Sequence, residues 1–168
     1  MKPNDLIHKA KTSGFHLWLL NRMSPRMVPF NKPHGFRILE ITDEYLRTLL
    51  PYRKSNFNHI RGLHATALAT LAEFTSGFML ISRIDPEKFR IILQKIEVEY
   101  FYQGKSDAFG YFELDDEWLE NRIYAPLEKS ESTVIPCTVH IVDGDKKLLA
   151  TGISHWQVKK WENVRTKR

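Results

Sequence analysis

The stretch His64–Ile84 reads HATALATLAEFTSGFMLISRI. Its apolar pattern predicts a helix over 65–84, which ends before Pro86 because a proline disfavours helical backbone at the preceding residue. Apolar side chains surround nearly the whole helix, so we expect the rest of the chain to enclose it. Glu73 is the only ionisable residue in its middle, and a carboxylate there would be costly in lipid. We therefore predict a buried helix in a folded domain and no stable membrane insertion.

Strand patterns lie on both sides of this helix. The predicted strands are 35–41 and 45–52 before it, and 88–101, 106–114, 134–142 and 146–158 after it. Asp143-Gly144-Asp145 predicts a hairpin between the last two strands. Pro136 indicates a sheet edge or a bulge in the first strand of that hairpin, because proline has no N–H to donate. This order predicts an α+β fold in which a curved antiparallel sheet wraps the helix.

The remaining segments are connections and ends. We predict short helices over 4–11 and 15–23, an extended or turn-like proline-containing segment over 24–34, a loop over 53–63, and a helical turn or irregular connection over 115–123. The basic residues 159–168 are expected to be a solvated, frayed tail. The chain is therefore divided into an N-terminal segment (1–34), a domain (35–158) and the tail.

Composition narrows the class of protein. The chain has 168 residues, of which 42% are hydrophobic and 27% charged, which excludes a disordered or fibrous protein. Cys137 is the only cysteine, so an intramolecular disulfide and a cysteine-based zinc site are both excluded. No metal-binding motif is present, and we expect no metal. The single cysteine leaves the redox compartment open, and the cytoplasm is the expected location.

Positive charge is concentrated in the first part of the chain. Residues 1–63 hold 11 Lys and Arg against 4 Asp and Glu, whereas residues 64–168 hold 14 against 16. The net charge of +5 favours an anionic partner, such as a phosphorylated small molecule, a membrane surface or a nucleic acid. No element combines basic and aromatic residues in a nucleic-acid-binding motif, so we expect no nucleic-acid partner.

Glu73 is the residue that most needs a functional explanation. Its neighbours on one helix face are all small: Thr66, Ala69, Thr70, Ser76 and Gly77. The opposite face has the larger Leu68, Leu71 and Phe78, which are typical of a core. A carboxylate on a face of small residues indicates a ligand site. The alternative is a structural carboxylate that is hydrogen-bonded to a strand or to a threonine hydroxyl.

The start of the same helix offers a second chemical group. Its first N–H groups have no helical partner and can hold an oxyanion. Ala65 and Thr66 are small enough to let a substrate approach this backbone. His64 lies nine residues before Glu73, which corresponds to a rise of about 13.5 Å. The two side chains cannot meet on one helix, so any shared chemistry must use the helix start for one role and Glu73 for another, and whether the two come from one subunit or from different subunits stays open.

The run from Asn58 to Glu73 resembles the signature of hotdog-fold acyl-CoA thioesterases, in particular the phenylacetate-pathway type and an uncharacterised hotdog family related to it. That pattern has an asparagine, a histidine six residues later, Gly-Gly, and an acidic residue nine after the histidine. Asn58, His64 and Glu73 fall on these positions, whereas Ala65 and Thr66 replace the two glycines. The resemblance covers residues 35–158 and implies a hotdog fold.

The resemblance also implies a mechanism and a partner. The Ala65 N–H would polarise the thioester carbonyl, Glu73 would activate water or attack directly, Asn58 would orient water or the thioester, and His64 would shape the loop. Thr66, Thr70 and Gly77 would line the substrate site, while Arg61, Lys105 and Lys54 are candidates to hold the phosphates of coenzyme A. Two subunits would pair their sheets in a homodimer, and a dimer of dimers stays open. Coenzyme A would be part of the substrate, with no separate cofactor.

Two further functions stay open at this point. The side chains of Ala65 and Thr66 narrow the site, so a non-catalytic hotdog module that binds an acyl or coenzyme A-like ligand is the alternative to a hydrolase. A basic nucleic-acid-binding protein is the third reading, and it predicts an affinity that falls steeply with salt.

Overall fold

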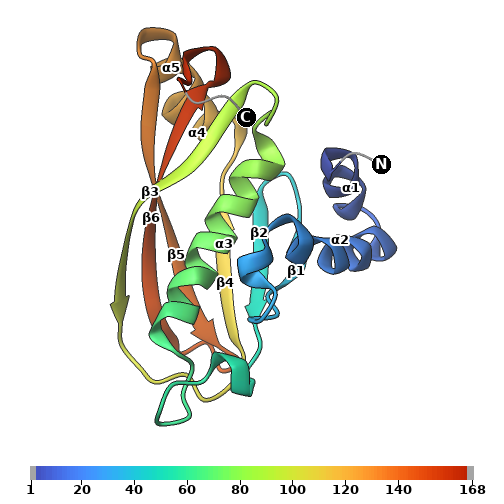
Figure 1. Cartoon of the computed structure of the whole chain (residues 1–168), viewed down its shortest axis with the longest axis vertical. Helices are drawn as coiled ribbons and strands as arrows, with labels where there is room; N and C mark the ends of the chain where they lie inside the picture. The colour runs from blue at the N-terminus through green and yellow to red at the C-terminus, as the bar shows by residue number, and fades with distance from the viewer. Residues whose placement is uncertain (1–2, 166–168) are drawn as a thin grey trace.

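The protein folds as a six-stranded antiparallel sheet that curves around one long helix, as shown by a computed structural model that describes residues 3–165 (Figure 1). The sheet order is β1-β2-β4-β5-β6-β3. The strands are β1 (Arg37–Ile41), β2 (Tyr45–Leu50), β3 (Phe89–Tyr100), β4 (Ala108–Glu113), β5 (Ser132–Asp143) and β6 (Leu148–Lys160). The helices are α1 (Pro3–Ala10), α2 (Gly14–Met27), α3 (Ala65–Arg83), α4 (Asp116–Leu119) and α5 (Ala125–Lys129). Three short 3-10 turns are η1 (Pro29–Asn31), η2 (Lys54–Asn56) and η4 (Trp161–Asn163), and η3 (Glu120–Tyr124) is a π-helical turn between α4 and α5. The predicted α+β architecture is confirmed.

Helix α3 lies against the sheet, and its apolar side chains form the centre of the core. Leu71, Met79 and Leu80 are fully buried. The helix approaches the sheet closely at Gly152, where a Cβ atom would lie only 2.5 Å from the Cβ of Ala72. By length and composition α3 could also cross a membrane, but 67% of its most apolar window is buried inside this fold. Its hydropathy is therefore that of a core helix.

Pro136 lies in a strand that is interior to the sheet, yet its position is locally an edge. Strand β4 pairs only with the last residues of β5, from His140 to Asp143. At Pro136 the strand pairs with β6 alone, opposite His155. The missing N–H of proline therefore costs no ladder hydrogen bond on the open side. The sequence-based expectation of an edge or bulge is confirmed in this local sense.

The N-terminal segment differs from the prediction. Helix α2 continues through Pro25 to Met27, and η1 follows directly, whereas the prolines predicted an extended or turn-like segment from residue 24. Pro25 lies in the last turns of α2, so its missing N–H removes a single helical hydrogen bond, the one to the carbonyl of Asn21. The fixed φ of proline is compatible with helical backbone, and the helix therefore survives.

Helix α2 covers the free edge of β1. The Asn21 side chain accepts a hydrogen bond from the Ile38 N–H at 2.7 Å and donates one to the Ile38 carbonyl at 2.8 Å. It thereby supplies both hydrogen bonds that a neighbouring strand would make at that residue. Leu6 and Leu20 are buried in the same core as the sheet. The N-terminal segment is thus packed onto the domain.

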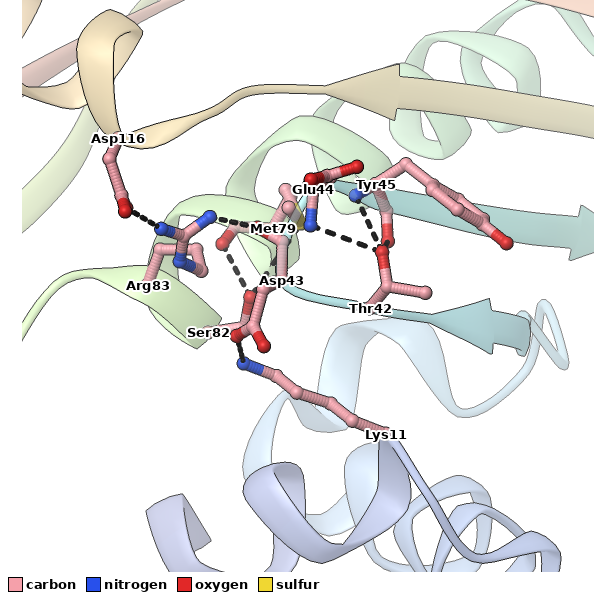
Figure 2. A network of polar contacts seen from close by, with 9 residues as sticks. All are labelled: Lys11, Thr42, Asp43, Glu44, Tyr45, Met79, Ser82, Arg83 and Asp116. Atoms are coloured by element: carbon pink, nitrogen blue, oxygen red, sulfur yellow. Dashed lines mark hydrogen bonds and ion pairs between the residues drawn. The ribbon is translucent and has the colours of Figure 1, made fainter.

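A polar network fixes the end of α3 to the elements around it (Figure 2). Arg83 donates hydrogen bonds to the Asp43 carbonyl in the β1–β2 turn and to the Asp116 carboxylate at the start of α4. The Lys11 ammonium, between α1 and α2, lies 2.6 Å from the Asp43 carboxylate. That hydrogen bond holds the pKa of Asp43 below its usual value. These contacts join four parts of the fold that are distant in the sequence.

The segment between β4 and β5 and the C-terminal tail are both more ordered than predicted. Residues 116–129 form the continuous helical segment α4–η3–α5, which extends beyond the predicted limit of residue 123. The prediction of a frayed C-terminal tail is wrong for the part of the tail that the structure describes. Strand β6 continues to Lys160, and the Trp161 indole N–H donates a hydrogen bond to the Pro86 carbonyl at 2.9 Å. Residues 166–168 of the predicted tail lie outside the described residues.

Candidate functional site

The Glu73 carboxylate is half-buried in the middle of α3. Among residues 3–165 no hydrogen-bond donor or cation pairs with it. Burial raises the pKa of Glu73, because the ionised form loses hydration and no positive charge compensates for the loss. The alternative of a structural carboxylate bonded to a strand or to a threonine is therefore not supported. A buried acid without a partner is typical of a group that acts on a ligand.

Glu73 opens onto a small, mostly apolar cleft of about 100 Å³. One wall comes from α3, and Trp156 of β6 forms part of the lining. The opposite wall comes from the end of α2 and from η1. The lining residues are Ser24, Met27, Val28, Asn31, Glu73, Phe74, Gly77, Phe78, Ile81 and Trp156. The cleft thus combines one carboxylate with an apolar surface that suits a hydrocarbon group.

The start of α3 has the free donor that the sequence predicted. His64 is the N-cap, and its ring Nδ1 accepts a hydrogen bond from the Thr66 N–H at 3.2 Å. The carbonyl of His64 accepts from the N–H groups of Ala67 and Leu68. Within residues 3–165 the Ala65 N–H has no acceptor, and Ala65 is exposed. This N–H is therefore free to donate to the oxygen of a ligand, and His64 caps the helix start.

Asn58 closes the loop that leads into α3. Its side-chain oxygen accepts hydrogen bonds from the N–H groups of Ile60 and Gly62, at 3.1 and 2.9 Å. The loop turns at Arg61, which has a positive φ of 59° and whose carbonyl accepts from the Tyr52 hydroxyl. Asn58 therefore positions the loop, and its oxygen is occupied in this structure.

Asn56 is a second organising residue, which the sequence analysis missed. It is almost fully buried, and its carbonyl accepts a hydrogen bond from the His64 N–H at 2.7 Å. Its side-chain amide donates to the carbonyls of His34 and Pro51, both at 2.9 Å. Asn56 thus connects the N-terminal segment to the start of α3. Only its place in a polar loop next to Asn58 could have drawn attention to it.

The predicted substrate-binding residues do not share one place. Gly77 lines the cleft, but it also packs under Trp156, where a Cβ would come within 2.5 Å of the ring. Thr66 and Thr70 lie on the exposed side of the first turns, and the Thr70 hydroxyl donates to the Thr66 carbonyl. At the C-terminal end of the face of small residues, the Trp156 indole packs against Gly77 and donates to the Ser76 hydroxyl at 3.0 Å, which leaves less free space there than the sequence predicted.

The candidate phosphate-binding cations lie at the end of the fold where α3 starts. Lys54, Arg61 and Lys105 are all exposed. Lys105 follows Gly104, whose carbonyl accepts a hydrogen bond from the Leu63 N–H just before α3. Backbone pairing thus brings two separate loops, and the cations on them, to the helix start.

Cys137 is excluded as a nucleophile. It is buried, and burial raises the pKa of its thiol to about 12, so the thiol stays protonated at neutral pH.

The two chemical groups on α3 are too far apart to act together within one chain. Ala65 and Glu73 are separated by eight residues, a rise of about 12 Å along the helix. Strand β3 ends the sheet and pairs with β6 alone among residues 3–165. Its 12 residues leave a long free edge. Such edges readily pair with another strand.

Solved structures share this fold. A Pseudomonas aeruginosa protein of unknown function, named a probable thioesterase, has a TM-score of 0.77 and 22% identity over 85% of this chain and 95% of its own. A Haemophilus influenzae thioesterase has a TM-score of 0.66 and 14% identity over 86% and 90%. A Chlorobaculum tepidum protein of unknown function has a TM-score of 0.70 and 13% identity over 94% and 96%. These likenesses confirm the hotdog fold.

Comparison with sequences adds the family. A search of curated proteins gives no match. The family model described as "Domain of unknown function (DUF4442)" matches residues 17–158, which include part of the N-terminal segment, strands β1 to β5 and all of β6 except its last two residues. The chain therefore belongs to the DUF4442 family and has the hotdog fold of the thioesterase structures that it resembles.

Proposed function

We propose that this protein hydrolyses a thioester, either an acyl-CoA or a related compound. The observation that carries the proposal is Glu73, a half-buried carboxylate without a partner among residues 3–165 that faces an apolar cleft. Its raised pKa suits a general base, which works best when its pKa lies near the working pH. The similar structures that are named thioesterases support the same class of reaction.

In the proposed reaction, Glu73 takes a proton from a water molecule whose oxygen attacks the thioester carbonyl carbon. The carbonyl oxygen becomes an oxyanion and accepts a hydrogen bond from the Ala65 N–H at the positive end of the α3 dipole. The C–S bond then breaks, and the protonated Glu73 returns its proton to the thiolate. The products are a carboxylic acid and a free thiol. The apolar cleft would hold the acyl group.

The proposed active unit is a homodimer. Glu73 of one protomer and the helix start of the other would share a site, since the rise between them on one helix is about 12 Å. Antiparallel pairing of two β3 edges would continue the sheet from one protomer into the next. We propose Arg61, Lys105 and Lys54 as contacts for the phosphates of coenzyme A, because all three are exposed at the helix-start end.

The test is thiol release from a panel of short, long and aryl acyl-CoA esters. Glu73→Gln keeps the size of the side chain and removes the base, so we expect turnover to fall by about 10²-fold or more. The matched control is Glu128→Gln on α5, where the same change affects an exposed glutamate outside the cleft. Turnover that survives Glu73→Gln would contradict the proposal.

The same panel distinguishes the binding-module alternative. Wild-type protein that binds acyl-CoA in a saturable way but releases no thiol, while it is folded and dimeric, would indicate a non-catalytic module. The loss of chemistry would then be assigned to the side chains of Ala65 and Thr66 at the helix start.

A further inference from the structure

The outward face of α2 has an unusual combination of side chains. Phe15 and Trp18 are 66% and 57% exposed, and their rings stack at a centroid distance of 5.9 Å. At about 100° per residue, Arg22 and Arg26 fall on the same face of the helix. Both arginines are exposed. Two large aromatic rings and two guanidinium groups are therefore presented together to solvent.

The surrounding sequence contains no negative charge to balance this face. Between Asp5 and Glu40 the chain has six Lys and Arg residues and no Asp or Glu. Lys11 is engaged with Asp43 of the β1–β2 turn. The other five are exposed and have no acidic partner among residues 3–165: Lys9, Arg22, Arg26, Lys32 and Arg37.

We propose that this face of α2, with Phe15, Trp18, Arg22 and Arg26, docks on an anionic lipid bilayer. Tryptophan and phenylalanine rings lie favourably at the level of lipid headgroups, and arginines beside them attract anionic lipids. The opposite face of α2 is held to the core by Leu20 and by the two hydrogen bonds of Asn21. The helix therefore needs no folding step when it binds.

A second copy of the chain fits this face less well. A twofold interface would place each cluster of cations against an identical cluster, and like charges across an interface are unfavourable. The proposed dimer edge, β3, lies on the other side of the molecule from α1 and α2 (Figure 1). The face is also a helix surface with protruding side chains. A bilayer can accept such side chains without a preformed groove.

The test is co-sedimentation of the full chain with vesicles of phosphatidylcholine alone and of phosphatidylcholine mixed with phosphatidylserine. We expect binding to the anionic vesicles only, with loss of binding at high salt. Arg22→Gln combined with Arg26→Gln should weaken the affinity about 30-fold. Phe15→Ala combined with Trp18→Ala should also weaken it at least tenfold, because the burial of two aromatic rings is lost. The matched control is Arg122→Gln combined with Lys129→Gln, an equal charge change on the α4–α5 segment.

Circular dichroism and size-exclusion chromatography of each variant complete the test. The proposal is overturned if wild type does not bind anionic vesicles, or if the control weakens binding as much as the arginine variant does. It is also overturned if the Phe15→Ala and Trp18→Ala change alters the oligomeric state, because the face would then be an interface between copies.

Discussion

Gly77→Ala should destabilise the protein, although alanine is the better helix former. A Cβ at this position would lie 2.5 Å from Cζ2 and 2.7 Å from Cη2 of Trp156. Carbon atoms in contact are normally about 3.5–4.0 Å apart, so the ring must retreat by about 1 Å. Trp156 resists this movement because its indole N–H donates to the Ser76 hydroxyl in the buried interior.

The expected cost follows from three contributions. Overpacking of a core costs about 1–3 kcal/mol, and weakening of the Trp156–Ser76 hydrogen bond adds about 1 kcal/mol. The helix propensity of alanine offsets about 1 kcal/mol. The free energy of unfolding should therefore fall by about 1–3 kcal/mol. At about 2–4 °C per kcal/mol, the midpoint of thermal unfolding should fall by roughly 2–12 °C.

Urea unfolding followed by circular dichroism measures this change. Gly14→Ala at the start of α2 is the control, because apart from its chain neighbours and the backbone of its own helix no atom lies within 4 Å of the added Cβ. The double variant with Trp156→Phe should lose less stability than the sum of the two single variants, by about 0.5 kcal/mol or more. A Gly77→Ala protein as stable as wild type, or more stable, would refute the argument that the ring and the helix are in hard contact.

Two further predictions concern the charge of Glu73 and the attachment of α2 to strand β1. Glu73→Gln should stabilise the protein at neutral pH, because burial in the folded state raises the pKa of Glu73. At a pH between the pKa of Glu73 in the unfolded state and its pKa in the folded state, the folded protein binds more protons than the unfolded chain. The free energy of unfolding of the wild type therefore falls as the pH rises through this range. Urea midpoints of the two proteins should therefore converge at a pH below the ordinary glutamate pKa and diverge above it, and a constant difference would argue against the desolvated carboxylate. Asn21→Ala should cost about 1–3 kcal/mol, because the buried edge at Ile38 loses both hydrogen bonds. Hydrogen exchange at the Ile38 amide measures this loss locally, and unchanged protection there would show that α2 is held by other contacts.

Local patterns were enough to predict most of the elements. The long apolar helix, the strands around it and the Asp143-Gly144-Asp145 hairpin depend on periodicity and turn residues, which act over a few positions. The prediction was wrong at two places, for different reasons. Pro25 remains inside α2 because the helix loses only one hydrogen bond there, which is a local reason. The described part of the basic tail is held by a tertiary contact, the hydrogen bond from the Trp161 indole N–H to the Pro86 carbonyl.

Some properties of the candidate site follow from the local sequence, and others depend on the tertiary structure. The sequence by itself determined that Glu73 has no charged neighbour on its helix and that a histidine begins that helix, because both properties depend on spacing along one element. Only the tertiary structure decided that Trp156 fills the space beside Gly77, and that the end of α2 forms the wall of the cleft opposite Glu73. These contacts join residues distant in the chain, and their geometry depends on how the sheet curves and how closely the helix packs, which no local pattern specifies.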